Sequence, residues 1–505
     1  MFWQEGKVES ILDKLYALNE SDFYPYHMPG HKRNGDSIFS IDITEIDGFD
    51  NMHRAAGIIK DAQRRAAELY GAKESFFLVN GSTCGLLSAI CASFQSGDKV
   101  LVARNCHKAV YHALELRGIK PVYIYPETDI DYDISVGITA KQVEEAINCE
   151  PKGMILTSPT YEGLISEVKE IAELLHRKDM ILIVDEAHGA HFGFHPAFPV
   201  SAVTQGADLV IQSLHKTLPS MTQTALLHRC SDRVSKGMIQ KYLGIFQTSS
   251  PSYVFMAYMD ECIRILEKQS NELFQAFYEK LEHFYKSCEN LKNIKVYQPR
   301  SVVITSCNEA ESLQKPEKQY CSDPGKVVIS ANGLTGKELY NILRQRFHLQ
   351  PEMCAGNYVL AIMTICDTDE GFTRLYEALE QLDKENEAIS SEQEITVSIE
   401  TSDQAVDRVK DTQKTLVSLL KERPIRKYLS REAEALEGEI LELKEAAGMV
   451  SKEYIYLYPP GIPFIVPGEV ISDKVVKALI NLKKLGYELQ GSADETGKSL
   501  TVVKE

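Results

Sequence analysis

Two stretches of the chain decide the fold, MILIVDEAHGAH (180–191) and DLVIQSLHKT (208–217). Each begins with an apolar run of the length expected for a strand buried on both faces, and each then turns polar. The first run is followed by Asp185 and the second by Lys216. Open α/β sheets bind ligands beyond the carboxyl ends of their strands, so this carboxylate and this amine mark a candidate ligand site.

The same pattern extends towards the N-terminus. Further apolar runs are FFLV (76–79), KVLVA (99–103), PVYIY (121–125) and GMILT (153–157). Helix-patterned stretches such as SEVKEIAELLHRKD (166–179) separate most of them. Buried strands that alternate with helices predict an α/β fold with a mainly parallel sheet.

Changes in pattern divide the chain into five parts. They are an N-terminal arm (1–35), a large ligand-binding domain (36–290), a small α+β domain (291–385), a polar linker or exposed strand (386–404) and a C-terminal α+β domain (405–505). We expect helices at 6–18, 57–71 and 256–290, each with apolar residues at helical spacing.

Composition excludes several classes of protein. The 505 residues include 55 Lys and Arg against 72 Asp and Glu, for a net charge of −17. Such an acidic chain is a poor candidate for binding nucleic acid or an anionic membrane, because phosphate contacts need a basic face. The acidity instead fits a cytosolic protein and mildly favours a cationic substrate.

Cysteines and apolar runs also bear on location. The chain has 11 cysteines, an odd number, and no C-x-x-C motif, which predicts reduced thiols rather than a disulfide framework or a four-cysteine zinc site. Charged residues interrupt the first turns of the chain, so we expect no signal peptide. No run of about 18 apolar residues occurs, so we expect no membrane span and a cytoplasmic location.

Two polar segments follow predicted strands and open predicted helices. NGSTCG (80–85) places Ser82 and Thr83 at a helix start, where hydroxyls and amides bind anions. It lacks the G-K-[ST] of a nucleotide-binding loop, and a plain helix cap is the alternative. NCHKAV (105–110) places His107 at another helix start, with a core histidine as the alternative.

The segment after residue 184 admits several interpretations. DEAH matches a helicase box, but no phosphate-binding loop accompanies it. His188, His191 and His195 suggest a metal cluster, but no H-E-x-x-H motif or carboxylate triad is nearby, and we predict no metal. A structural aspartate with surface histidines is a third reading. Lys216 taken alone also has two interpretations. A lysine that is shielded from water has a lowered pKa and acts as a nucleophile, whereas most lysines at strand ends are exposed to solvent.

Taken together, these residues favour one ligand, pyridoxal phosphate. A lysine holds its aldehyde as a Schiff base, and a carboxylate pairs with its ring nitrogen. Hydroxyls and His215 suit its phosphate, an imidazole stacks on one ring face, and a small residue such as Ala187 leaves room on the other.

The chain resembles the bacterial ornithine/lysine/arginine decarboxylase family, in its short form without an N-terminal wing domain. The resemblance runs nearly end to end. The motifs that carry it are PYHMPGHK (25–32), TEIDGFDNMH (44–53), GIIKDAQRRAAELYGAKESFFLVNGST (57–83), RNCHKAV (104–110), PTYEG (159–163), VDEAHGAH (184–191), SLHKTLPSMTQTALLH (213–228), QTSSPSY (247–253) and YPPGIPFIVPGE (458–469). It implies the aspartate-aminotransferase-like fold, known as fold type I.

The resemblance also implies roles for individual residues. Lys216 would hold the cofactor aldehyde, Asp185 would pair with the ring nitrogen, His107 would stack on the ring, and His188 would lie near the substrate carboxylate or the aldehyde. The implied phosphate ligands are Ser82, Thr83, Ser213 and His215, with Ser249 and its neighbours reaching the phosphate of a second chain in a homodimer.

The implied reaction is α-decarboxylation of a basic amino acid, with arginine favoured over lysine and ornithine, to give an amine of polyamine metabolism. Candidate partners for the substrate's distal cation are Asp47, Asp50, Glu352 and Glu469. The alternatives are an aminotransferase with Arg344 and Arg346 as a carboxylate fork, a cyclase or eliminase acting on an arginine derivative, and a non-catalytic cofactor-binding regulator.

Overall fold

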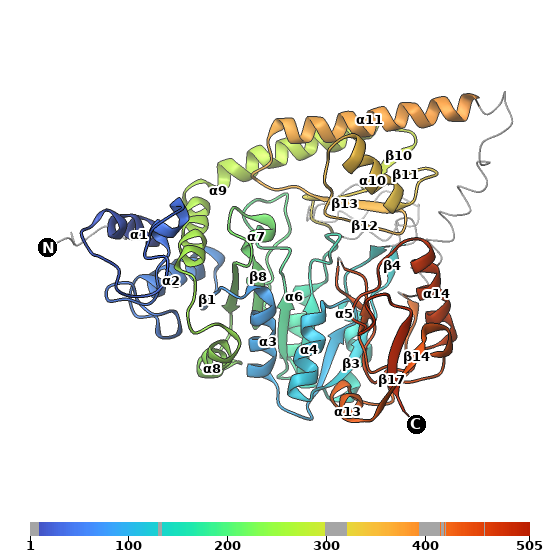
Figure 1. The fold of residues 1–505 in the computed structure, drawn as a ribbon, viewed down its shortest axis with the longest axis horizontal. Coiled ribbons are helices and arrows are strands. Elements are labelled where there is room, and N and C mark those ends of the chain that lie inside the picture. Colours follow the sequence, from blue (N-terminus) through green and yellow to red (C-terminus); the bar gives the residue numbers. More distant parts are fainter. Residues whose placement is uncertain are drawn as a thin grey trace, which may run out of the picture.

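A computed structural model describes residues 10–129, 134–297, 321–392, 415, 419, 421–458 and 460–504, with the backbone alone for 386–392. A seven-stranded sheet lies at the centre of the large domain (Figure 1). Its strands, in spatial order, are β1 (Glu74–Leu78), β9 (Ala225–Arg229), β8 (Leu209–Ser213), β7 (Ile181–Asp185), β6 (Gly153–Thr157), β2 (Lys99–Ala103) and β3 (Lys120–Ile124). The strands from β8 to β3 are parallel, which confirms the predicted α/β fold.

The six apolar runs predicted as strands all form strands of this sheet, with bounds within two residues of the prediction. The sequence-based reading missed β9, which pairs antiparallel with both β1 and β8. Its apolar run is only Ala225–Leu227, and polar residues of the preceding motif run up to it. The missed strand matters because it lies between β1 and β8, and so places the start of the helix after β1 one strand away from β8.

Helices cover the sheet and bury its central strands. They include α2 (Ile58–Tyr70), α3 (Gly81–Ser93), α4 (Lys108–Arg117), α5 (Ala140–Ala146), α6 (Val168–His176) and α8 (Lys236–Phe246). Every residue of β8 is buried, and Val184 and Ile211 have no exposed surface. This two-sided burial explains why the strands read as continuous apolar runs rather than as alternating ones.

A buried carboxylate anchors the N-terminal arm. Asp260 on α9 (Tyr253–Cys288) accepts a hydrogen bond from the backbone N–H of Ile11 at the start of α1 (Ile11–Glu20), at 3.1 Å. The same carboxylate pairs with Arg65 at 3.2 Å and with Arg264 at 3.0 Å. The predicted helix at 6–18 therefore exists from residue 11, and its first residues lie outside the described part.

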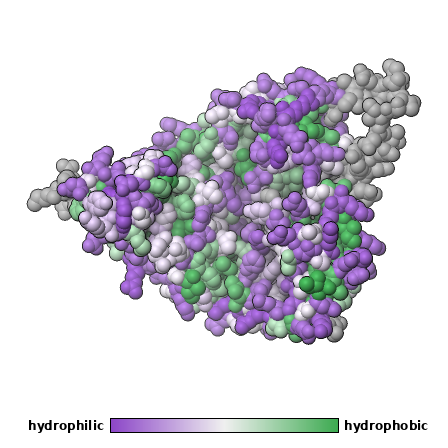
Figure 2. Space-filling model, in the orientation of Figure 1, coloured by the Kyte–Doolittle hydropathy of each residue, from purple (hydrophilic) through white to green (hydrophobic). Residues whose placement is uncertain are grey.

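The small domain is a four-stranded antiparallel sheet in the order β10 (Ile294–Val296), β11 (Lys326–Ala331), β13 (Tyr358–Ile362) and β12 (Met353–Ala355), with helices α10 (Gly336–Arg346) and α11 (Asp369–Glu392). Helix α11 lies along α9, where Phe372 packs against Phe277 and Phe284 (Figure 1). Hydrophilic side chains cover the outer side of this helix (Figure 2). Since α11 continues to Glu392, residues 386–392 extend a helix and are not an exposed strand. The rest of the predicted linker, 393–404, lies outside the described residues, and the linker stays a prediction.

The C-terminal domain packs against α4 and β3 (Figure 1). Its elements are α13 (Ser430–Ala435), the antiparallel pairs β14 (Gly438–Glu442) with β17 (Ser499–Val503) and β15 (Ile455–Tyr456) with β16 (Pro463–Ile465), and α14 (Asp473–Lys484). Arg104 attaches it to the large domain by donating hydrogen bonds to the carbonyls of Pro463 (2.5 Å) and Phe464 (3.1 Å). Throughout the part of the chain that the structure describes, the helices are too short or too polar to cross a lipid bilayer.

Candidate active site

The carboxyl ends of β7 and β8 carry the two residues on which the predicted site depends. Asp185 ends β7, and Lys216 lies on α7 (Leu214–Thr217), the single turn that follows β8. Helix α3 begins shortly after β1, and Ser82 in its first turn contacts Ser213 at the end of β8, with 2.6 Å between the hydroxyl oxygens. The fold thus brings the carboxylate, the amine and the hydroxyls to one edge of the sheet.

Asp185 is a buried carboxylate, only 4% exposed. Burial raises its pKa, while the Lys216 amine and the backbone N–H of Ala187, which donates to Asp185 Oδ1 at 3.2 Å, act in the opposite direction. Ala187 itself is buried beside it. A carboxylate in this position is stabilised by a cationic partner, which is what a protonated pyridine nitrogen supplies.

Lys216 is partly buried, and its amine contacts the imidazole of His188, with 3.0 Å between Nζ and Nε2. Burial lowers the pKa of Lys216, and the carboxylates of Asp185 and Glu352 oppose this shift. Burial, and then the charge of Lys216, hold the pKa of His188 well below its usual range. The ring of His188 is therefore neutral at pH 7, and it lies directly beside the candidate nucleophile.

His107 caps helix α4: its Nδ1 accepts a hydrogen bond from the backbone N–H of Ala109 at 3.2 Å. Burial, followed by the charge of Lys216, lowers its pKa to about 4, so the ring is neutral. The C-terminal domain reaches this ring at Gly461, where a Cβ atom would lie 3.3 Å from the imidazole. The backbone of Gly461 also accepts a hydrogen bond from the N–H of Lys108 at 3.0 Å.

Of the remaining predicted cofactor ligands, Thr83 and His215 belong to the segments that follow β1 and β8, and Ser249 lies farther along the chain. Thr83 is exposed in the first turn of α3, and His215 donates its Nδ1–H to the carbonyl of Thr224 at 2.9 Å. Ser249 lies on the exposed loop between α8 and α9. Its role towards a second chain therefore stays a prediction.

Sequence reasoning gave no role to Lys326 or Tyr161, although both lie at the site. Lys326 is the first residue of β11 and is 2% exposed, and its amine lies 2.6 Å from His188 Nδ1. The ring of Tyr161 lies 4.5 Å from that of His188. The pattern that singled out Lys216 does not apply to Lys326, because Lys326 precedes its apolar run rather than following it.

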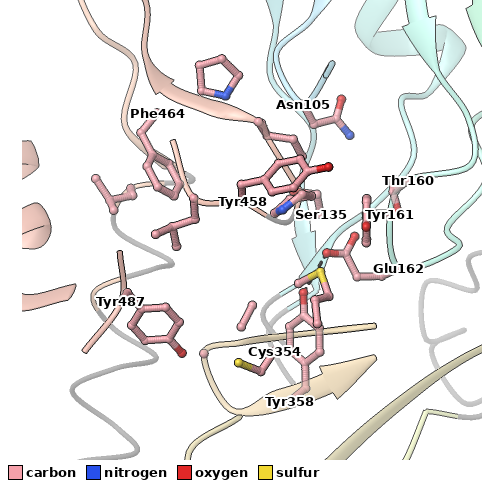
Figure 3. A pocket seen from close by; sticks show the side chains of 18 of the residues that line it. Asn105, Ser135, Thr160, Tyr161, Glu162, Cys354, Tyr358, Tyr458, Phe464 and Tyr487 are labelled. Atoms are coloured by element: carbon pink, nitrogen blue, oxygen red, sulfur yellow. Dashed lines mark hydrogen bonds between the residues drawn. The ribbon is translucent and has the colours of Figure 1, made fainter. Parts of the chain in front are cut away.

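A cavity of about 350 Å³ opens beside these rings, between the large, small and C-terminal domains (Figure 3). Four glutamates line it: Glu162, Glu352, Glu422 and Glu488. Tyr358 donates a hydrogen bond to Glu162 at 2.7 Å, and Tyr161 donates one to Glu352. Burial raises the pKa of Glu162, with the Tyr358 hydroxyl opposing. The wall thus carries four carboxyl groups beside two cationic side chains, Arg104 and Lys337.

Of the predicted substrate residues, Glu352 lines the cavity and Glu469 does not. Glu469 is 1% exposed, pairs with Arg104 at 3.2 Å and accepts the backbone N–H of Val466 at 2.9 Å. In this structure the carboxylate helps attach the C-terminal domain, and a role of Glu469 towards the substrate stays a prediction without support from these contacts.

Asp50 is also a structural residue. Its carboxylate accepts backbone N–H groups at the start of α2 and in the loop before it, from Asn51, Ala56, Gly57, Ile59 and Lys60. Although burial raises its pKa, these hydrogen bonds lower it below the usual value. The carboxylate of Asp50 thus caps the start of α2, and its assignment to the substrate stays a prediction without support from these contacts. Asp47 is exposed in the same loop, and the cavity of this chain does not include it.

The three histidines after Asp185 have separate partners. His188 contacts the two lysines, His191 pairs with Asp323 at 3.1 Å, and His195 contacts Gln275 at 3.0 Å. Among the described residues no three His, Cys, Asp or Glu side chains are grouped so as to hold a metal ion. The arginine fork required by the aminotransferase reading is also engaged elsewhere, since Arg346 pairs with Glu385 on the surface.

Comparison with solved structures defines the class. The fold is similar to lysine decarboxylase from Francisella novicida, with a TM-score of 0.83 and 20% identity over 98% of this chain and 81% of that one. The constitutive lysine decarboxylase of E. coli gives a TM-score of 0.82 at 19% identity, over 98% and 82%. The chain therefore shares the fold of these solved structures over nearly its whole length, including the C-terminal domain.

Sequence comparison defines the family. Residues 19–371 match the major domain of the Orn/Lys/Arg decarboxylases and residues 421–496 match their C-terminal domain. The chain is 33% identical to the arginine decarboxylase of Bacillus subtilis, over 95% of this chain and 94% of that protein. It is 31% identical to the arginine decarboxylase of Halalkalibacterium halodurans, with the same coverage. The chain belongs to the Orn/Lys/Arg decarboxylase family, and it is a decarboxylase.

Proposed function

We propose that this protein removes the α-carboxylate of a basic amino acid with pyridoxal phosphate as cofactor, and that arginine is the preferred substrate over lysine and ornithine. The observation that carries the proposal is the contact of Lys216 with a neutral His188, next to the buried Asp185. Several similar proteins are named arginine decarboxylase, which supports the choice of arginine.

The donor set fits the cofactor. Lys216 would hold its aldehyde, Asp185 its ring nitrogen, and His107 one face of its ring, with Ala187 on the other. The hydroxyls of Ser82, Thr83 and Ser213, with His215, would hold the phosphate at the start of α3, where helix N–H groups favour an anion. When bound, the cofactor supplies an electron sink for the pair released as the carboxylate leaves.

The chain's own residues prepare this chemistry. Burial favours the neutral form of the Lys216 amine, which is the form that attacks an aldehyde. The buried Asp185 carboxylate would favour a proton on a ring nitrogen held beside it. His188 keeps a hydrogen-bonding atom 3.0 Å from the reacting amine, in a position to hold a proton there.

The carboxylate-lined cavity supports a cationic substrate. Glu352 is the candidate for the distal group, because its carboxylate lies in the cavity wall and its charge acts on both Lys216 and Lys326. The volume of about 350 Å³ leaves room for the longest of the three substrates, arginine.

A homodimer and a cytoplasmic location belong to the same proposal. Phe23, Tyr24, Tyr26 and Met28 are all more than 60% exposed, and such a run of exposed apolar side chains is typical of an interface. Ser249 lies on an exposed loop that could serve a partner's site. The described cysteines are all free thiols, as in a reducing compartment.

The test incubates purified protein and pyridoxal phosphate separately with arginine, lysine and ornithine, and measures released CO2 and amine. We expect both products, fastest from arginine. A keto acid would establish an aminotransferase instead, and a cyclised product would establish a cyclase. A spectrum that responds to arginine without any product would indicate a non-catalytic regulator.

A further inference from the structure

His188 lies between two lysines from different domains. Its Nε2 is 3.0 Å from the amine of Lys216 in the large domain, and its Nδ1 is 2.6 Å from the amine of Lys326 in the small domain. Both contacts are within hydrogen-bonding distance, and Lys326 and His188 are buried. The proposed function assigns no role to Lys326, so its position needs a separate explanation.

Counting protons restricts the arrangement. A neutral imidazole has one N–H donor and one acceptor nitrogen, and a protonated lysine has donors only. Two protonated lysines therefore cannot both donate to a neutral His188. If both contacts are hydrogen bonds, one lysine is the charged donor and the other is a neutral amine that accepts the ring N–H.

The distances indicate Lys326 as the donor. Its amine lies 2.6 Å from the ring against 3.0 Å for Lys216, as in a charge-assisted hydrogen bond. Burial lowers the pKa of both amines, that of Lys326 to about 8, and carboxylates oppose the shift at each: Asp323, Glu352 and Glu162 at Lys326, Asp185 and Glu352 at Lys216. Lys216 is the residue that must be neutral to react.

We propose that Lys326 is a positioning residue that donates a hydrogen bond to His188 Nδ1 and thereby keeps the ring proton on Nε2, facing the Lys216 nitrogen. This inference rests on the proposed function: its spectroscopic and labelling readouts need the proposed cofactor, and its kinetic readout needs the proposed reaction. Tyr161 holds the ring from its side, at a centroid distance of 4.5 Å and an interplanar angle of 58°. The small domain thus sets the tautomer of a group in the large domain.

The experiment compares Lys326→Met, which keeps length but removes the donor, with Lys326→Gln, which keeps a neutral donor. We expect kcat to fall about ten- to a hundredfold in Lys326→Met, the effect of losing a hydrogen bond to a charged group, with KM changed much less. Lys326→Gln should recover part of that loss. A packing role alone predicts the reverse order, because Met is the apolar replacement of similar shape.

A double-mutant cycle tests whether Lys326 acts through His188. We expect Lys326→Met to have little further effect in a His188→Gln background, whereas additive losses would overturn the proposal. The matched control is Lys295→Met, the same change at an exposed lysine on the adjacent strand β10. It should leave kcat unchanged, and equal losses in Lys326→Met and Lys295→Met would also overturn the proposal.

Two readouts do not require turnover. The absorption spectrum of the bound pyridoxal group, at fixed pH, should differ between wild type and Lys326→Met but not between wild type and Lys295→Met. Borohydride reduction and peptide mapping should locate the pyridoxyl group on Lys216, and a label on Lys326 would overturn the assignment.

If no amino acid is decarboxylated but these results hold, the proposed function fails and the role of Lys326 stands. If Lys326→Met does not fold, Lys326→Gln combined with His188→Gln gives the same cycle.

Discussion

The two sides of the site are built differently. The side around Lys216 comes from the ends of neighbouring strands in one sheet, within the large domain. The opposite side, the cavity wall, comes from three domains: Glu162, Glu352 and Glu488 are far apart in sequence. In the proposed function, the nucleophile and the ring-nitrogen partner come from one sheet, whereas the group that orients His188 and the cavity wall depend on how the domains pack.

The largest effect is expected when the amine of Lys216 is removed. We expect Lys216→Ala to abolish turnover of all three substrates, because no other group at the strand ends can replace a lysine nucleophile. CO2 release and borohydride labelling measure the effect. Robust activity in this variant would mean that the nucleophile lies on the other side, with Lys326 the next candidate.

The next test compares two adjacent buried carboxylates. Asp185→Asn should reduce kcat about a thousandfold, since a broken buried charge pair costs about 3–5 kcal/mol. Glu186→Gln is the control, because Glu186 accepts hydrogen bonds from Ser201 and Gln212, both at 2.7 Å, and lies outside the site. Steady-state kinetics should show near-normal kcat for Glu186→Gln. Equal losses of kcat in both variants would mean that Asp185 has no special role in the reaction.

Glu186 also gives a prediction for stability. Burial raises its pKa from 4.5 to about 7, against the hydrogen bonds of Ala202, Ser201 and Gln212. Because the pKa of Glu186 is higher in the folded state, its protonation contributes to the free energy of unfolding. This contribution is complete below pH 4.5, is lost as the pH rises through 7, and amounts to at most about 3 kcal/mol. Thermal unfolding between pH 5 and pH 8 should show a smaller pH dependence in Glu186→Gln than in wild type. An unchanged slope would exclude this group as the cause.

The smallest expected effect is on the cavity wall. Glu352→Gln should raise KM for arginine about tenfold with a smaller change in kcat, because it removes one of several carboxylates facing the substrate cation. Glu377→Gln, at an exposed position on α11, is the matched control. If Glu352→Gln lowers kcat alone, the residue belongs with the chemistry around Lys216 rather than with recognition.

The same division explains what the sequence could predict. The proximity of Asp185, Lys216 and Ser82 to one edge of the sheet could be predicted, because buried strands read as apolar runs and these polar residues come shortly after such runs. Lys326 begins a strand more than a hundred residues later, and only the packing of the small domain brings it to His188. The contacts of Glu469 and Asp50 could not be predicted, because a motif shows a carboxylate but not its partner, which here is Arg104 for one and a helix start for the other.

The contact of Gly461 with His107 has a consequence for the order in which the enzyme is assembled. Every residue expected to touch the cofactor in this chain precedes position 250, yet the loop that closes over the imidazole lies in the last tenth of the polypeptide. During synthesis, the large sheet can form while this ring is still open to water. A product truncated before the loop would carry all the catalytic groups and still lack a finished site.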